Sequence, residues 1–193
     1  MSHSKFSRRS MLGGIAATLS VPSIIEAQEP ISPAVEGPAI PERNTSFFQR
    51  RYWRDYFSNL RLGCILCDIS GRAVHFWTSD ETYRLYPSSV PMTDELTRRG
   101  RTHIARMKLN PSWTPTEHMR KEDPTLPTFM PPGPENPLGT HALYLTWPAY
   151  LIHGTHDTRK IGRQSSSGCI GLYNQHIKQL YDLTKIGTQV LIL

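Results

Sequence analysis

The sequence predicts a mainly β domain with short helices, and three stretches carry this prediction. Residues 62–69 form an apolar run typical of a buried strand. Ser70 and Gly71 then supply turn residues, and residues 73–78 predict the returning strand of a hairpin. Residues 189–193 are again apolar and predict a closing strand.

Length and charge limit the possible classes of protein. The 193 residues have room for one domain with appendages, and 38% of them are hydrophobic. The formal net charge of +6 suits an anionic polymer such as a cell wall or a nucleic acid. The chain carries no run of Lys and Arg and no nucleic-acid-binding motif, so we exclude nucleic acid as a partner.

The first 27 residues predict a twin-arginine export signal. Arg8 and Arg9 precede an apolar run of small residues that extends through Ile25. This run is too short, and too broken by a proline, for a good membrane span. Ala27 suits a cleavage site but Ile25 does not, so an uncleaved anchor remains an alternative. The signal predicts a periplasmic protein.

Two segments separate this signal from the domain. Residues 28–46 predict an extended linker, because four prolines fall among Glu, Gly and Ser without periodicity. Residues 47–60 predict an amphipathic helix that packs on the domain. The residues at helical spacing are Phe48, Tyr52, Trp53, Tyr56, Phe57 and Leu60.

The domain itself is predicted to cover residues 61–193. It contains a further strand pattern at 83–90 and a short helix at 176–183. Cys64 and Cys67 have the spacing of a redox pair, but they fall within a predicted strand, where residues three apart face opposite sides. We therefore interpret them as core residues.

A histidine and a cysteine suggest the chemistry. His153 closes a short apolar run, and Cys169 follows Gly168 and is followed by apolar residues. A cysteine is a nucleophile only as its thiolate, which an adjacent base can supply. The amides of Gly168 and Cys169 are candidates to face an oxyanion. From these residues alone, a buried cysteine and a core histidine remain the alternative.

The surrounding motifs resemble the L,D-transpeptidase family with a YkuD-type catalytic domain, in its periplasmic branch. The motif positions are His153-Gly154-Thr155 and Ser166-Ser167-Gly168-Cys169-Ile170. Upstream matches are Trp113-Thr114-Pro115-Thr116, Pro131-Pro132-Gly133-Pro134, Asn136-Pro137-Leu138-Gly139 and Ala142-Leu143-Tyr144-Leu145.

This resemblance implies a β-sandwich or cradle and a cysteine acyltransferase without metal or cofactor. Cys169 would form an acyl-enzyme with a peptidoglycan tetrapeptide stem and release D-alanine, with His153 as the base. The Gly154 carbonyl would orient the imidazole, and Ser167 or Ser166 would bond near the thiolate. Gly168, Ser166, Thr155 and Arg163 complete the oxyanion and substrate-binding candidates. The acceptor would be another stem or an outer-membrane protein amine.

Two features qualify this interpretation. Gly171 stands where the family has Arg or Asn, and we expect Arg159 or Arg163 to substitute and Gly171→Arg to leave activity intact or raise it. Residues 110–139 are dense in Pro and Gly, with Trp113, Met119 and Phe129 as apolar anchors. By analogy with the family this segment covers the cleft.

Two alternatives to the transpeptidase function remain. The acyl group could be transferred to water, or the domain could be a non-catalytic wall-binding module.

Overall fold

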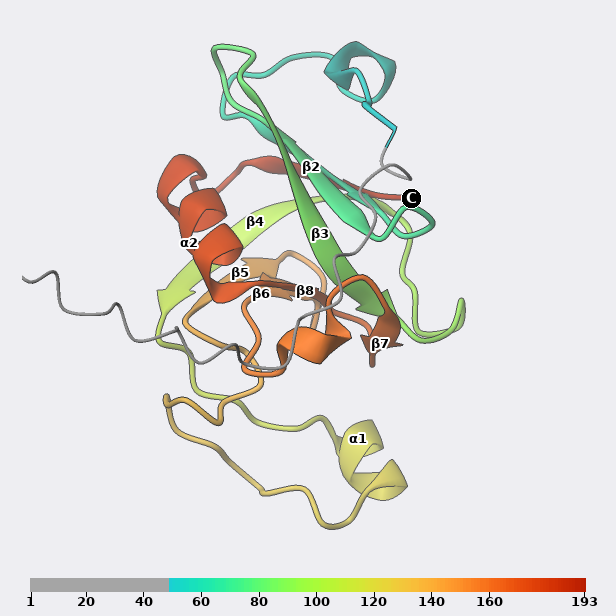
Figure 1. Ribbon diagram of the computed structural model, residues 1–193, viewed down its shortest axis with the longest axis vertical. Helices are drawn as coiled ribbons and strands as arrows, with labels where there is room; N and C mark the ends of the chain where they lie inside the picture. Colours follow the sequence, from blue (N-terminus) through green and yellow to red (C-terminus); the bar gives the residue numbers. More distant parts are fainter. Residues whose placement is uncertain (1–48) are drawn as a thin grey trace, which may run out of the picture. The chain divides into compact units, whose positions relative to one another are not determined.

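The computed structural model describes residues 49–193 (Figure 1). The predicted signal (1–27) and linker (28–46) lie outside the described residues and stay predictions. Within the described part, no helix is long and apolar enough to cross a membrane.

The described chain is mainly β, as predicted, and it has two short α-helices. The strands are β1 (Cys64–Asp68), β2 (Ala73–Trp77), β3 (Tyr83–Pro91), β4 (Gly100–Leu109), β5 (His141–Leu145), β6 (Leu151–His153), β7 (Gln164–Ser166), β8 (Ile170–Leu172) and β9 (Gln189–Ile192). The helices are α1 (Glu117–Glu122), α2 (Asn174–Leu183) and two 3-10 turns, η2 (Trp53–Asp55) and η3 (Thr158–Lys160).

One sheet folds back on itself to enclose the core. Its strand order is β2-β1-β9-β4-β5-β6-β8-β3-β7, and β2 also pairs with β3, which closes the circuit. The long strands β3 and β4 take part in both halves: β3 pairs with β2 and then β8, and β4 pairs with β9 and then β5. A register shift in β4 between Ile104 and Arg106 accompanies this change of partner.

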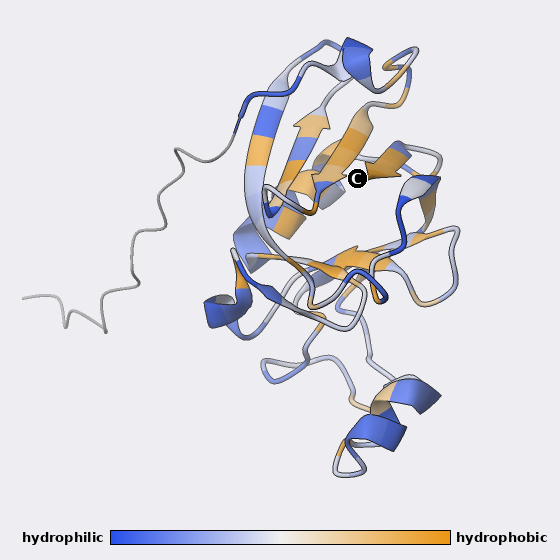
Figure 2. Cartoon of the chain, turned by 90° about the vertical axis from the view of Figure 1, so that its right-hand side faces the viewer, coloured by the Kyte–Doolittle hydropathy of each residue, from blue (hydrophilic) through white to orange (hydrophobic). Residues whose placement is uncertain are grey.

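The inward faces of both halves are apolar. The main core includes Phe76, Ile104, Leu143, Ile152 and Ile170, each at most 1% exposed. Figure 2 shows apolar residues gathered on the strands, whereas α1 is mostly hydrophilic. Helix α2 packs on β5 and β6 through its buried residues, so its apolar side covers the core while its other side meets solvent.

The predicted hairpin is confirmed and its turn has a clear cause. Strands β1 and β2 pair antiparallel, and the Gly71 amide donates to Asp68 Oδ1 at 2.8 Å across the turn. Cys64 and Cys67 are both free thiols that pack in two different apolar clusters, as expected for residues three apart on a strand. Burial raises the pKa of the Cys64 thiol to about 12 and that of Cys67 further still, so neither is poised for redox chemistry.

The helix predicted over residues 47–60 is wrong for the described part of that range. From residue 49 onward the segment contains only η2 and otherwise irregular backbone. Phe57 and Leu60 anchor it in a cluster with Trp77, while Tyr52 is 65% exposed. Aromatic residues lose side-chain freedom in a helix, and here packing of individual rings on the β1–β2 hairpin outweighs the helical spacing.

The N-terminal segment therefore docks through Phe57 and not through a helical stripe. We predict that Phe57→Ala lowers the free energy of unfolding by about 3 kcal/mol, because a buried ring is lost without refilling. The control Tyr52→Ala, which removes a ring that the helix would have buried, should change it by less than about 0.5 kcal/mol. Urea unfolding of both variants measures this, and equal losses would contradict the docking described here.

Candidate active site

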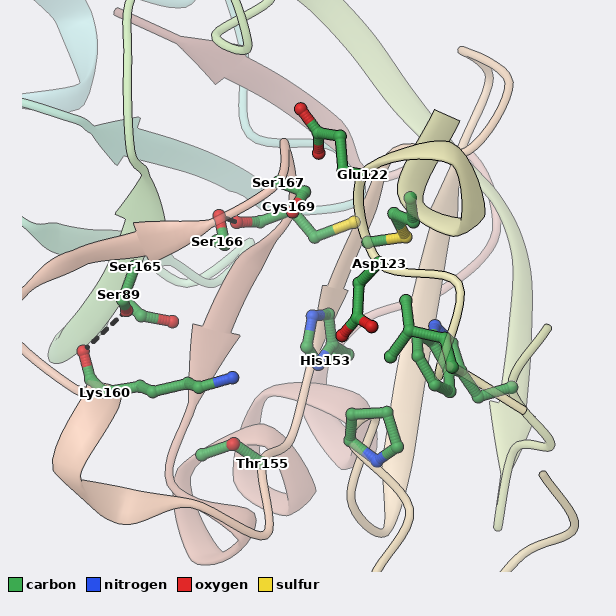
Figure 3. A pocket seen from close by; sticks show the side chains of 14 residues that line it. Ser89, Glu122, Asp123, His153, Thr155, Lys160, Ser165, Ser166, Ser167 and Cys169 are labelled. Atoms are coloured by element: carbon green, nitrogen blue, oxygen red, sulfur yellow. Dashed lines mark hydrogen bonds between the residues drawn. The ribbon is translucent and has the colours of Figure 1, made fainter. Parts of the chain in front are cut away.

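The site is built where two short strands pair in parallel. In β6 and β8, Ile152 faces Ile170 and His153 faces Gly171. His153 is the last residue of β6, and Cys169 immediately precedes β8. The ladder therefore brings residues 16 positions apart in the sequence to one end of one sheet. Figure 3 shows both side chains lining the same pocket.

His153 is held in one tautomer. Its Nδ1 lies 2.5 Å from the Gly154 carbonyl oxygen. Because a carbonyl can only accept, Nδ1 carries the proton and Nε2 keeps its lone pair. Burial lowers the pKa of His153 to about 4; the bond to Gly154 acts in the opposite direction, and the charge of Lys160 lowers it further. The imidazole is therefore a neutral base at pH 7.

Gly154 is required by a close approach from α2. The Asn174 side-chain oxygen occupies the position that a Cβ at Gly154 would take, and it accepts a hydrogen bond from the Thr140 amide at 3.1 Å. Asn174 Nδ2 donates to the Thr155 carbonyl, also at 3.1 Å. These two bonds hold Asn174 against Gly154, whose carbonyl orients His153, and leave no room for a Cβ at this position.

The thiol of Cys169 is half-buried and protonated at rest. Its Sγ donates to the Ala149 carbonyl at 3.4 Å, from a turn in which Ala149 has φ +63°. Burial raises the pKa of Cys169 to about 11, and the Leu151 amide partly offsets this by favouring the thiolate. The free protein thus holds a neutral thiol beside a neutral imidazole.

The loop before β8 supplies free amides. Gly168 has φ +130°, a conformation that favours glycine. No hydrogen bond within residues 49–193 uses the amides of Gly168 or Cys169. Ser166 Oγ donates to the Cys169 carbonyl at 2.5 Å, which braces the loop and does not reach the thiol. Ser167 is exposed and lines the pocket.

The pocket has a volume of about 320 Å³, and three parts of the chain line it. The first contains His153 and Cys169. A second comes from the segment that contains α1, and a third from η3 and β7. The lining residues beyond the motif are Ser89, Trp113, Met119, Glu122, Asp123, Leu126, Pro137, Lys160 and Ser165.

The segment at 110–139 forms a cover whose base is tied down. Trp113 and Met130 exchange two backbone hydrogen bonds, of 2.9 and 2.8 Å. Asn136 is buried, and its Nδ2 donates to the carbonyls of Pro111 at 3.0 Å and Pro131 at 2.9 Å. These bonds hold both ends of the segment while its tip projects over the pocket.

Two details of this cover differ from the prediction. Helix α1 forms at its tip, where Thr116 Oγ1 accepts from the Met119 amide at 3.2 Å as an N-cap. The available signal was Thr116 as an N-cap residue followed by Glu117 in the first turn. Trp113 and Met119 line the pocket as anchors, but Phe129 is 55% exposed and anchors nothing.

The predicted substrate-binding residues divide between pocket and periphery. Thr155 lines the pocket, and its hydroxyl accepts from the Asp157 amide at 3.1 Å. Arg163 is exposed and is not among the lining residues. Arg159 binds Asp157 through Nε at 2.8 Å. Lys160 is instead the cation that reaches the pocket. Within residues 49–193, no group of three or more His, Cys, Asp or Glu is placed to hold a metal.

The surroundings of Gly171 reverse one expectation. Gly171 is buried in β8, and the Ser89 hydroxyl occupies the position that its Cβ would take. The His153 Cε1 atom lies 3.9 Å from that same position. An arginine there would displace Ser89 and press on the imidazole, so Gly171→Arg is no longer expected to preserve activity.

The family follows from comparison with known proteins. A family model described as the YkuD L,D-transpeptidase catalytic domain matches residues 63–192. The chain therefore belongs to the YkuD family of L,D-transpeptidases, cysteine enzymes that act on peptidoglycan stem peptides.

Two curated relatives support this membership. The chain is 51% identical over 159 residues to "Putative L,D-transpeptidase in ATP synthase subunits region ORF 5" of Fuscovulum blasticum, which covers 81% of this chain and 82% of that protein. It is 34% identical over 139 residues to "Probable L,D-transpeptidase ErfK/SrfK" of Escherichia coli strain K12, which covers 69% of this chain but only 44% of that protein.

Solved structures share the fold at low sequence identity. L,D-transpeptidase 3 from Mycobacterium tuberculosis superposes with a TM-score of 0.55 at 14% identity, over 68% of this chain and 61% of that chain. LdtMt1 in complex with imipenem gives 0.53 at 15% identity, over 68% and 59%.

The neutral resting pair predicts how Cys169 reacts with an alkylating agent. Because its pKa is raised to about 11, the rate of iodoacetamide labelling should rise about tenfold per pH unit between pH 7 and 10. Intact mass against time at each pH measures the rate. Folded Cys169→Ala should remain unlabelled, since Cys64 and Cys67 are buried. A rate that levels off below pH 8 would show that a thiolate–imidazolium pair exists at rest.

Steric coupling between Gly171 and Ser89 gives a second prediction. Gly171→Ala should lower the free energy of unfolding by about 1–3 kcal/mol through overpacking. Adding Ser89→Ala removes the conflicting hydroxyl and should recover about 1 kcal/mol. Gly171→Arg should reduce both stability and turnover. Full turnover in Gly171→Arg, or strictly additive losses in the double variant, would refute the coupling.

Proposed function

We propose that this chain is a peptidoglycan L,D-transpeptidase in which Cys169 forms the acyl-enzyme. The observation that carries the proposal is the Nδ1 bond of His153 to the Gly154 carbonyl, because it leaves Nε2 unprotonated on a ring that lines the same pocket as Cys169. A thiol and a base fixed in this way suit acyl transfer.

The acylation step uses only residues of this pocket. His153 Nε2 takes the thiol proton as Cys169 turns from the Ala149 carbonyl, and Sγ attacks the carbonyl between the diamino acid and the terminal D-alanine. The amides of Gly168 and Cys169 receive the oxyanion. The C–N bond then breaks, His153 returns the proton to the leaving amine, and D-alanine departs from the thioester.

The deacylation step is proposed to use an amine. The amine attacks the thioester, His153 accepts its proton, and the Cys169 thiol reforms as the new amide leaves. Supporting this acceptor, the end of α1 brings Glu122 and Asp123 to the pocket. Their negative charges attract the protonated amine, which loses one proton to solvent before it attacks the thioester. The acceptor is proposed to be a second stem peptide, giving a 3-3 cross-link, or a protein amine.

Product analysis tests this proposal. Full-length protein incubated with disaccharide-tetrapeptide should release D-alanine and yield cross-linked dimers, and Cys169→Ala should yield neither, which muropeptide mass analysis would detect. Asp123→Asn should raise the ratio of tripeptide to dimer, because the acceptor amine loses an attracting charge. Tripeptide without dimers from the wild type would move the function to hydrolysis or to a protein acceptor. No product from folded wild type would favour the non-catalytic wall-binding module.

We also propose a periplasmic location. The support is the order of Arg8, Arg9 and the following apolar run within residues 1–27. Fusing residues 1–27 to a reporter that must fold before export should deliver it to the periplasm. Changing both arginines to lysine should retain the reporter in the cytoplasm. Unchanged export of the lysine variant would exclude the twin-arginine route.

A further inference from the structure

Lys160 is the single cation among the described residues that line the pocket. Its backbone is fixed by η3: its amide donates to the Asp157 carbonyl at 3.2 Å, and its carbonyl accepts from Ser165 Oγ at 3.2 Å. These bonds fix the position of the Lys160 backbone at the edge of the pocket, and the exposed side chain extends from there.

The Lys160 side chain extends into the site, and its ammonium is available to bind an anion. Figure 3 shows its side chain extended toward His153. Within residues 49–193 its Nζ forms no ion pair or hydrogen bond. The neighbouring Arg159, by contrast, bonds Asp157 through both Nε and Nη2, at 2.8 and 3.0 Å. An ammonium without a partner in a pocket attracts an anion.

The wall of the pocket opposite Lys160 carries negative charge, so the electric field across the pocket has a direction. Glu122 and Asp123 line the pocket from the end of α1, whereas Lys160 enters from η3. A donor carboxylate is therefore attracted to the Lys160 side of the pocket and repelled from the Glu122 and Asp123 side, which is left to the acceptor amine. Gly171 cannot supply a cation, and the Ser89 hydroxyl fills the space beside it.

We propose that Lys160 binds a free carboxylate of the donor stem peptide and so sets the donor specificity of this enzyme. The inference rests on the proposed function, because the donor is the stem peptide that acylates Cys169. Two carboxylates of such a donor share this chemistry: the terminal carboxylate of D-alanine and the side-chain carboxylate of the diamino acid. A charge-assisted hydrogen bond from the ammonium would recognise either one.

Three donors and three variants of the full-length protein test the assignment. The donors are disaccharide-tetrapeptide with both carboxylates free, with the terminal carboxylate amidated, and with the side-chain carboxylate amidated. The variants are Lys160→Gln, Lys160→Arg and the control Lys178→Gln, whose native lysine pairs with Asp182 on α2. The measured quantity is kcat/KM for release of D-alanine or D-alaninamide.

Wild type should prefer the free donor over one of the amides, which identifies the carboxylate bound. Lys160→Gln should lower kcat/KM on the free donor about tenfold and leave that amide unaffected, so the preference collapses. Lys160→Arg should retain the preference, and Lys178→Gln should match wild type.

Equal slowing of all three donors by Lys160→Gln would overturn the inference, because Lys160 would then act only through the electrostatics of His153. An unchanged preference in Lys160→Gln would overturn it as well. Both results leave the proposed function standing. Wild type that releases nothing from any donor would overturn the proposed function, and the role of Lys160 with it.

Discussion

The parallel pairing of β6 with β8 is the constraint on which the site depends. Each strand has three residues, and their pairing places His153 at the end of β6 and Cys169 immediately before β8. The ladder is held by Ile152 and Ile170 in the main core, so the positions of the two reactive side chains are set by hydrophobic packing. Helix α2, whose Ile177 and Leu180 lie in the same core, packs Asn174 against Gly154, and this joins the orientation of the imidazole to that core.

Electrostatics adds a second constraint, which keeps the Cys169 thiol unreactive in the absence of substrate. Burial favours the neutral forms of both the thiol and the imidazole, and the thiol donates a hydrogen bond to the Ala149 carbonyl in the resting arrangement. A permanent thiolate at an accessible site would be open to oxidation. A thiol that ionises only when substrate displaces water and draws it toward His153 avoids that exposure.

Elements that depend on local signals were predictable from the sequence. The β1–β2 hairpin, the strand ending at His153 and helix α2 follow from apolar runs, turn residues and periodicity. Strand β4 was missed because its register shift interrupts alternation and only Ile104 is fully buried. The prediction of a helix over 47–60 was wrong because the aromatic rings at helical spacing pack individually on the β1–β2 hairpin and do not form one continuous face. Lys160 was missed because no sequence pattern marks which of Arg159, Lys160 and Arg163 lines the pocket; the folding of η3 decides it.

The central claim, that Cys169 is the acylated nucleophile and His153 its base, is tested most directly by the intact mass of the protein itself. Full-length protein would be mixed with disaccharide-tetrapeptide, quenched in acid after seconds, and mapped by peptide mass. The account predicts an adduct of the donor minus D-alanine on the peptide containing Cys169, formed far more slowly in His153→Ala. An adduct on another residue, or equal formation in His153→Ala, would contradict it.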